Sequence, residues 1–152
     1  MKKLTTVLSA VLLTALSAAP LWSADGLIKV KSPHDAKKTM DRLEKIVKEK
    51  GMNIFARINH SAGAAKINKK LRPTELLIFG NPQGGTPFMA CEQTVGIDLP
   101  LKALVWQDDK GQVWLGYNDP EFIAKRHGAE KCPVVENMQK ALAGFTDAAV
   151  KP

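Results

Sequence analysis

The stretch FGNPQGGTPFMACEQTVGIDLPLKALVWQDDKGQVWLGY, residues 79–117, decides most of what the sequence predicts about the fold. Its second half predicts a β-hairpin, because two apolar strands flank the turn DDKG at residues 108–111. A type I turn closed by Gly111 in the left-handed conformation then sets the register of the two strands. That register pairs Asp108 with Gln112, Trp106 with Trp114 and Val105 with Leu115.

Both faces of the predicted hairpin are apolar, although an antiparallel sheet with one solvated face normally alternates apolar with polar side chains. One face carries Leu104, Trp106 and Trp114, and the other carries Ala103, Val105, Val113, Leu115 and Tyr117. A covering layer is therefore expected on each side. Helices are expected on one side, and a second subunit or a ligand on the other.

The first half of the stretch predicts a loop followed by a short helix. The sequence GNPQGG, residues 80–85, is rich in turn residues and is expected to end the preceding strand. Thr86 and Pro87 then form a helix start with proline at the first helical position, and Cys91 lies on the apolar face of that helix. The loop is only superficially like a phosphate-binding loop, because it lacks the Gly-Lys-Ser/Thr ending.

Hydrophobic periodicity predicts the remaining elements and indicates an α+β fold, an antiparallel sheet with helices packed on one face. The first long helix is expected to begin at Ser32–Pro33 and to end at Gly51. The final helix is expected to begin at Cys132–Pro133. The other expected elements are strands at 27–30, 52–59 and 74–79 and short helices at 61–71 and 118–128. The strand at 52–59 is expected to alternate, with one apolar stripe formed by Met52, Ile54, Ala56 and Ile58.

The N-terminal sequence MKKLTTVLSAVLLTALSAAPLWSADG is typical of a secretory signal peptide, with lysines before a short apolar segment and small residues after it. We expect cleavage after Ala24, which leaves residues 25–152 as a single domain in the periplasm or outside the cell. The apolar segment is shorter than the roughly 20 residues of a transmembrane helix, so no membrane span is expected.

The net charge of the whole 152-residue chain is +7, and removal of Lys2 and Lys3 lowers it to +5. The lysines cluster on one helix and at Lys66, Lys69 and Lys70, where solvent-exposed helix faces are the favoured interpretation. Anionic lipid or lipopolysaccharide is the alternative partner for these lysines. Nucleic acid is not expected, because an exported protein does not meet it.

The two cysteines, Cys91 and Cys132, are expected to form a disulfide because the chain is exported. Two separate thiols are the alternative, with Cys91 packed as a small hydrophobic residue. A catalytic cysteine is less favoured, because the sequence has no Cys-x-x-Cys pair and no evident activating neighbour.

His60 follows a strand and precedes a helix, where its side chain could line a pocket, although a structural role is favoured over a ligand or acid–base role. His34 and His127 are expected to face solvent at helix ends. A soft-metal or haem set is conceivable, but its spacing matches no recognised site, so neither a metal nor a cofactor is predicted. That set is His60, Met89, Cys91, His127 and Cys132.

The order of the histidine, the FGNP loop, the leucine-proline strand entry and the hairpin resembles the bacterial domain-of-unknown-function family number 302. The resemblance also includes INHSAGAAKINKKLRPTEL before the stretch and NDPEFIAKRHG after it. It implies a TATA-binding-protein-like fold in the order β-α-β-β-β-β-α with short extra helices, often dimeric, and no agreed activity. It does not imply DNA binding. Cys91 and Cys132 do not belong to the general family pattern.

These observations predict an exported, non-catalytic module that binds a small molecule or an envelope protein and forms a homodimer. One alternative is a redox or metal-binding protein, or an enzyme, that uses His60 with Cys91, and another is a structural or stress-related accessory protein of the envelope. The candidate ligand-binding residues are His60, Asn81, Trp106, Trp114 and Tyr117.

Overall fold

The computed structural model describes residues 26–152, and the predicted signal peptide at 1–24 lies outside these described residues. The described chain forms five strands, five α-helices and one 3₁₀ helix, η1. In chain order they are β1 (Leu27–Ser32), α1 (Ala36–Glu49), β2 (Asn53–Asn59), α2 (His60–Ala65), β3 (Thr74–Gly80), α3 (Pro82–Cys91), η1 (Gln93–Ile97), β4 (Leu101–Gln107), β5 (Val113–Asn118), α4 (Pro120–His127) and α5 (Val134–Val150).

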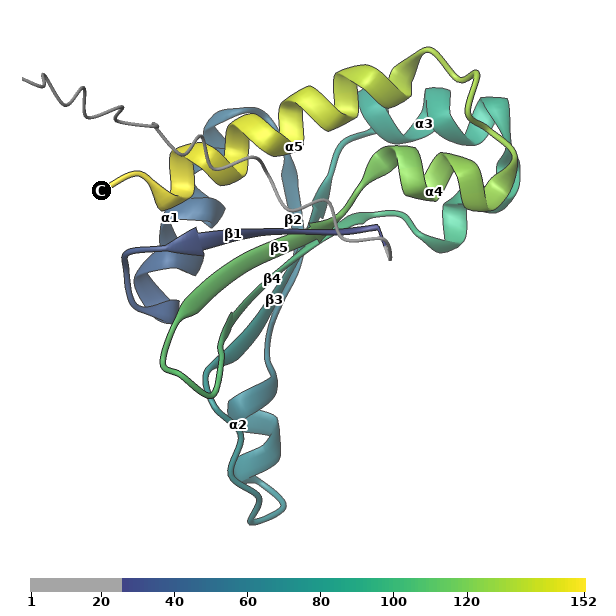
Figure 1. Cartoon of the computed structure of the whole chain (residues 1–152). Coiled ribbons are helices and arrows are strands. Elements are labelled where there is room, and N and C mark those ends of the chain that lie inside the picture. The colour runs from purple at the N-terminus through teal and green to yellow at the C-terminus, as the bar shows by residue number, and fades with distance from the viewer. Residues whose placement is uncertain (1–25) are drawn as a thin grey trace, which may run out of the picture.

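The strands form one antiparallel sheet in the order β1-β5-β4-β3-β2 (Figure 1). The predicted hairpin register is confirmed, since Trp106 pairs with Trp114 across β4 and β5. In the turn, the amide of Asp108 donates to the carbonyl of Gln112 at 2.9 Å, and Gly111 has a φ of 80°. The turn chemistry therefore fixes the hairpin as the sequence predicts.

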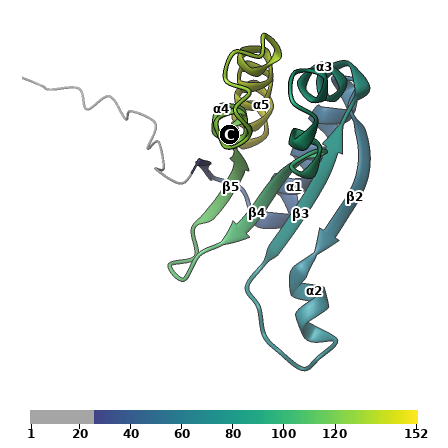
Figure 2. The same ribbon diagram turned by 90° about the vertical axis from the view of Figure 1, so that its right-hand side faces the viewer.

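Helices α1 and α5 pack on one face of the sheet, and α3, η1 and α4 gather at one end of it (Figures 1 and 2). This arrangement confirms the predicted α+β class. A main core joins α1 and α5 to the strands, and its fully buried members are Met40, Leu43, Val47, Leu77, Phe79, Val105, Leu115 and Ala149. A second apolar cluster joins α3, η1, α4 and the first half of α5, with Phe88, Val95, Ile123 and Met138 among its members.

Helix α1 begins three residues later than predicted. Ser32 is the last residue of β1, where it pairs with Val113, so it cannot cap the helix. Asp35 is the cap instead, because its Oδ1 accepts a hydrogen bond from the amide of Lys38 at 2.7 Å. Sheet pairing has overridden the local Ser-Pro signal.

The predicted loop at 80–85 is wrong, because α3 begins inside it. Asn81 caps the helix by accepting from the amide of Gly84 at 3.0 Å, and Pro82 occupies the first helical position. The helix ends at Cys91 because Glu92 is extended, and Val95 lies in the separate helix η1. The predicted helix start at Thr86 is therefore displaced toward the N-terminus.

Strand β2 does not alternate as predicted, because a β-bulge at Phe55 interrupts its pairing with β3. Ile54 pairs with Phe79 on the helix-covered face, whereas Ala56 pairs with Ile78 on the other face. The single apolar stripe predicted for this strand is therefore divided between the two faces.

Candidate functional site

A cavity of about 470 Å³ lies between α5 and the α3–η1 segment, at the end of the sheet where β2 and β4 begin and β3 ends. This volume lies in the range of pockets that take small organic ligands. Its lining residues come from six elements and the loops between them. They are Met52, Asn53, Phe55, Gly80, Asn81, Pro82, Gly84, Gly85, Thr86, Met89, Gly96, Leu99, Pro100, Leu101, Met138, Ala141, Leu142 and Phe145.

The lining of the cavity is mostly apolar and contains no charged side chain. Three methionines, Met52, Met89 and Met138, contribute flexible thioether side chains that can adjust to the shape of a ligand. Glycines provide room along the α3 wall. A Cβ atom at Gly85 would meet Leu99 at 3.6 Å, and one at Gly96 would meet the Met89 sulfur at 3.3 Å. The lining therefore favours an uncharged, largely apolar ligand.

A few polar groups could orient such a ligand. The side chains of Asn53, Asn81 and Thr86 line the cavity. The Oδ1 atom of Asn81 already accepts the helix-capping hydrogen bond from Gly84. Its Nδ2 group donates a hydrogen bond to none of the described residues. Asn81 therefore offers a donor to a carbonyl, ether or hydroxyl oxygen of a ligand.

A disulfide joins the two walls of the cavity. Cys91 at the end of α3 is bonded to Cys132 just before α5, with their Cα atoms 5.9 Å apart. This confirms the predicted bridge over the alternatives of separate thiols and a catalytic thiol. Because α3 and α5 form facing walls, the bond limits how far they can separate.

The five predicted ligand residues are not brought together. Asn81 lines the cavity, whereas His60 begins α2 at the opposite end of the sheet (Figures 1 and 2). Trp106 and Trp114 stack with ring centroids 6.4 Å apart on the face without helices. Tyr117 lies in the main core on the other face, where burial raises the pKa of its hydroxyl.

His60 and Cys91, the pair in the alternative redox or metal hypothesis, also lie at opposite ends of the sheet, and Cys91 has no free thiol. Within residues 26–152, no group of three or more His, Cys, Asp or Glu side chains could hold a metal ion. His60 and Cys91 therefore share no site at which they could act together.

His127 is not solvent-facing as predicted, because it bridges η1 and α4 with its side chain only 8% exposed. Its Nε2 lies 2.8 Å from Asp98 Oδ2, and its Nδ1 lies 2.9 Å from Thr94 Oγ1. The Thr94 hydroxyl donates to Glu92 at 2.9 Å, so its proton is not directed to the imidazole. The network therefore holds η1 against α4 rather than activating a hydroxyl. His34, in contrast, makes an exposed bond to the carbonyl of Lys151.

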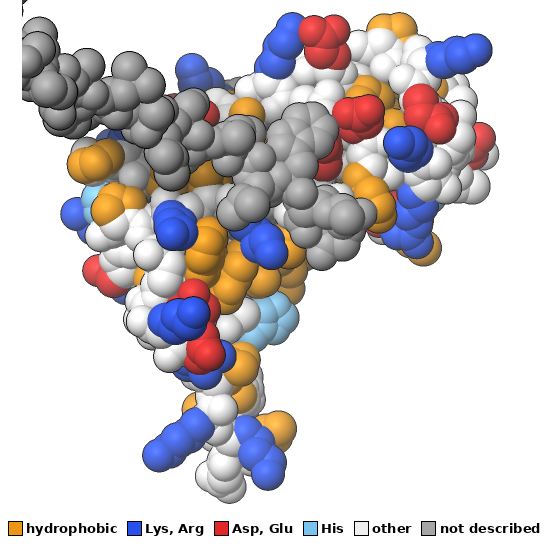
Figure 3. Space-filling view, viewed as in Figure 1, with side chains coloured by type: hydrophobic (Ala, Val, Ile, Leu, Met, Phe, Trp, Pro, Cys, Tyr) orange, Lys and Arg blue, Asp and Glu red, His pale blue; other side chains and the backbone are white. Residues whose placement is uncertain are grey.

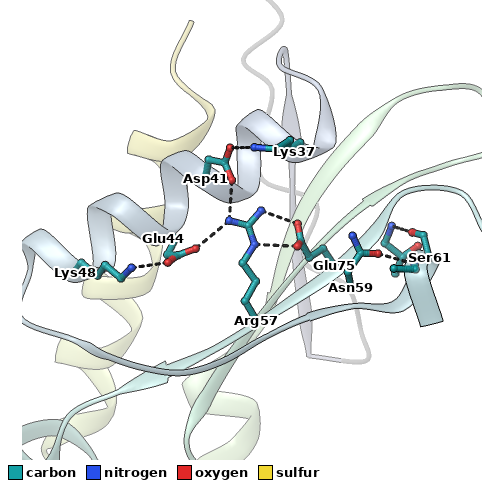
Figure 4. Close-up of polar contacts among 10 residues, drawn as sticks. Lys37, Asp41, Glu44, Lys48, Arg57, Asn59, Ser61 and Glu75 are labelled. Carbon is teal, nitrogen blue, oxygen red and sulfur yellow. Dashed lines mark hydrogen bonds and ion pairs between the residues drawn. The ribbon is translucent and has the colours of Figure 1, made fainter.

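Arg57 is the centre of a charge network beneath α1 (Figure 4). Its Nε and Nη2 atoms donate to both carboxylate oxygens of Glu75 at 2.8 and 2.9 Å, and its Nη1 donates to Asp41 and Glu44 at 2.7 and 2.9 Å. The hydrogen bonds that Arg57 donates to Glu75, Asp41 and Glu44 raise the pKa of Arg57 above its ordinary value. Four of the five N–H donors of Arg57 have acidic partners, which is typical of a structural cluster joining α1 to β2 and β3.

The face of the sheet without packed helices is also apolar. Register places Ala56, Ile58, Leu76, Ile78, Leu104, Trp106 and Trp114 on it, with Lys29, Lys31 and Lys102 as its charged residues. Lys31 lies over the Trp114 ring, 5.5 Å from its centroid. Hydrophobic side chains are visible beside lysines in this part of the surface (Figure 3). This is the face for which the sequence predicts a second subunit or ligand.

Sequence reasoning missed most of the cavity. Met138, Ala141 and Phe145 belong to a helical stripe that reads only as core, and Met52 precedes a strand. Glycines at 80, 84 and 85 were the available signal, because small residues leave space beside a helix. Without the α5 wall, that signal indicates a loop rather than a pocket.

Two curated proteins are similar to part of this chain. Proteins named "Fluoride-specific ion channel FluC 1" from Brucella suis biovar 1 (strain 1330) and Brucella abortus biovar 1 (strain 9-941) are each 49% identical over 102 residues. The match covers 67% of this chain but only 40% and 38% of those proteins. Within residues 26–152, no helix is long and apolar enough to cross a membrane.

A solved structure supports the fold. The crystal structure of an uncharacterized conserved protein DUF302 from Bacillus stearothermophilus has a TM-score of 0.75 and 21% identity, and the match covers 83% of this chain and 99% of that one. A family model described as "Domain of unknown function DUF302" matches residues 28–145, which is more than half of the chain. The chain therefore belongs to the DUF302 family, as its histidine, loop and hairpin pattern predicts.

Proposed function

We propose that the protein is an exported, non-catalytic binding module that holds a neutral, largely apolar small molecule in the cavity between α3 and α5. The observation that carries this proposal is an apolar cavity of about 470 Å³ whose lining has no charged side chain. Asn81 supplies a hydrogen-bond donor at its edge, which can select for a ligand with one polar group. The disulfide supports an oxidising compartment, in agreement with the predicted signal peptide.

The test uses N-phenyl-1-naphthylamine, an uncharged aromatic dye whose fluorescence rises in apolar surroundings. Ala141 faces the cavity from α5, so Ala141→Trp should fill the space and lower dye affinity at least tenfold. Ala143→Trp is the matched control, since Ala143 is two residues further round the helix and does not line the cavity. Equal dye binding by the wild type and both variants, with native circular dichroism, would overturn the proposal.

We propose, as a second feature, that the open apolar face of the sheet pairs with another copy of the chain. Strand and residue spacings give this face roughly 450 Å² per copy, so that a dimer would bury roughly 900 Å² in total. This area is slightly below what a stable interface needs, so the dimer should be weak.

Light scattering across a concentration series measures the dimerisation, and a monomer at all concentrations would contradict pairing. Replacing Leu104 with lysine should abolish the dimer without entering the core.

The name of the Brucella relatives provides a further candidate role, as a domain that acts beside a fluoride channel. Because the match covers about two fifths of those proteins, we propose that it corresponds to a region outside their pore. The apolar cavity is unsuited to fluoride, which prefers hydrogen-bond donors and cations. We therefore expect no fluoride binding by the isolated chain in titrations followed with a fluoride electrode, and saturable binding would contradict this expectation.

A further inference from the structure

Residues 60–73, here called the α2 tip, project from the end of the sheet opposite the cavity (Figures 1 and 2). The base of the tip is held in place by side chains. The Asn59 side chain caps α2 by accepting from the amide of Ala62 at 2.8 Å. The Ser61 hydroxyl donates to the Arg72 carbonyl at 3.0 Å and accepts from the Thr74 amide at 2.9 Å (Figure 4). The tip is therefore a preformed projection.

Two large aliphatic side chains are exposed on this projection. Ile67 is 69% exposed and Leu71 is 49% exposed, and neither belongs to a core cluster. Exposed aliphatic residues can occur singly on any surface, so they have meaning here only in combination with their surroundings.

Those surroundings are basic. The tip carries Lys66, Lys69, Lys70 and Arg72 and has no acidic residue. None of the four forms an ion pair with a described residue, and Arg72 donates only to the Gln107 carbonyl. Figure 3 shows basic side chains beside hydrophobic ones on the projecting end of the molecule.

The lysines of α1 provide the contrast. Lys37, Lys45 and Lys48 are each paired with an acidic residue one turn away on the same helix. Such pairs neutralise the surface locally. Lys38 of α1 has no such partner among the described residues, but the tip differs from α1 in that all four of its basic residues lack one and no acidic residue lies within it.

We propose that the α2 tip docks on the surface of an anionic lipid bilayer. Lipid phosphates complement the unpaired lysines, and the interfacial region accepts the two aliphatic side chains. A single surface thus satisfies both features of the tip. Single-stranded nucleic acid is a poorer fit, because the tip lacks the Phe, Tyr and Trp side chains on which bases stack.

The test is flotation of the full chain, after signal-peptide removal, with vesicles of phosphatidylcholine alone or with 30% phosphatidylglycerol. Binding should require the anionic lipid and should be lost in 0.5 M salt. The triple variant Lys66→Gln/Lys69→Gln/Lys70→Gln should bind roughly 100-fold more weakly. Each lysine near an anionic surface contributes about 1 kcal/mol, which is about a fivefold change in affinity. Ile67→Ser/Leu71→Ser should also weaken binding at low salt.

The matched control is Lys37→Gln/Lys45→Gln/Lys48→Gln, which removes the same charge from α1 and should change vesicle binding by less than threefold. An equal loss in both triple variants would assign binding to net charge and overturn the role of the tip. Absence of wild-type binding at millimolar lipid would overturn the proposal altogether, including the case in which the tip binds an acidic protein. Circular dichroism and thermal unfolding verify that each variant is folded.

Discussion

Reduction of the Cys91–Cys132 disulfide should destabilise the fold by about 4 kcal/mol. The bond closes a loop with a sequence separation of 41 residues. For a loop of this length, the chain-entropy relation gives a loss of about 13 cal/mol/K in the unfolded state, or about 4 kcal/mol at 25 °C. The loop contains η1, the β4–β5 hairpin and α4, so the bond constrains a large part of the unfolded chain.

Urea unfolding followed by circular dichroism measures this effect. With a slope of about 2 kcal/mol/M, the midpoint of the reduced protein should lie roughly 2 M below that of the oxidised protein. Cys91→Ala/Cys132→Ala should unfold near the reduced wild type and should not respond to reductant. Coincident midpoints for oxidised and reduced wild type would refute the reasoning, because the constraint would then be absent or offset by strain.

Two further predictions concern single side chains. Arg57→Gln should cost about 1–3 kcal/mol at pH 7, whereas the control Arg72→Gln should cost little, because Arg72 has no ion pair among the described residues. Hydrogen bonds from Lys37 and Arg57 lower the pKa of Asp41, and those from Lys48 and Arg57 lower the pKa of Glu44. The stabilisation of the folded state by these two carboxylates is fully present above their pKa values in the unfolded chain, which are near 4. It is lost as the pH falls through their lower pKa values in the folded protein. The Arg57→Gln penalty should therefore shrink between about pH 5 and pH 2 in urea titrations, and a constant penalty would contradict the network. Gly116→Val should cost about 1–3 kcal/mol and alter the near-ultraviolet tryptophan signal, because a Cβ there would lie 2.9 Å from the Trp106 ring and 3.0 Å from the Ile28 carbonyl oxygen. Gly144→Ala, which has open space around its Cβ, should be neutral or stabilising, and equal costs for both variants would contradict the steric argument.

Features set by short-range interactions were predictable from the sequence. The hairpin register follows from its four-residue turn, and the inward stripe of α5 follows from helical spacing. The start of α1 was not predictable locally, since Ser32 and Asp35 are both good caps. The pairing of Ser32 with Val113, 81 positions away, decides between them.

The candidate site depends even more on long-range packing. The glycines at 84 and 85 weaken helix propensity, yet the Asn81 cap and the burial of Phe88 are sufficient for α3 to form. The cavity then requires Met52 and Phe145 to approach from opposite ends of the chain. No local pattern encodes that approach, because each residue reads as an ordinary member of a strand or helix face.

Phe55 contributes to one wall of the cavity, but as the extra residue of a β-bulge it has no partner in the neighbouring strand β3. Without Phe55, residues 53–59 would alternate regularly between the two faces, with every observed partner in β3 unchanged. Phe55 is 59% exposed and lines the cavity, so the sheet can lose or change it at little cost. In the proposed binding role, a substitution of Phe55 is therefore expected to change ligand preference while the fold stays constant. The extra residue of the bulge thus supplies the cavity with a side chain that the pairing of the sheet does not require.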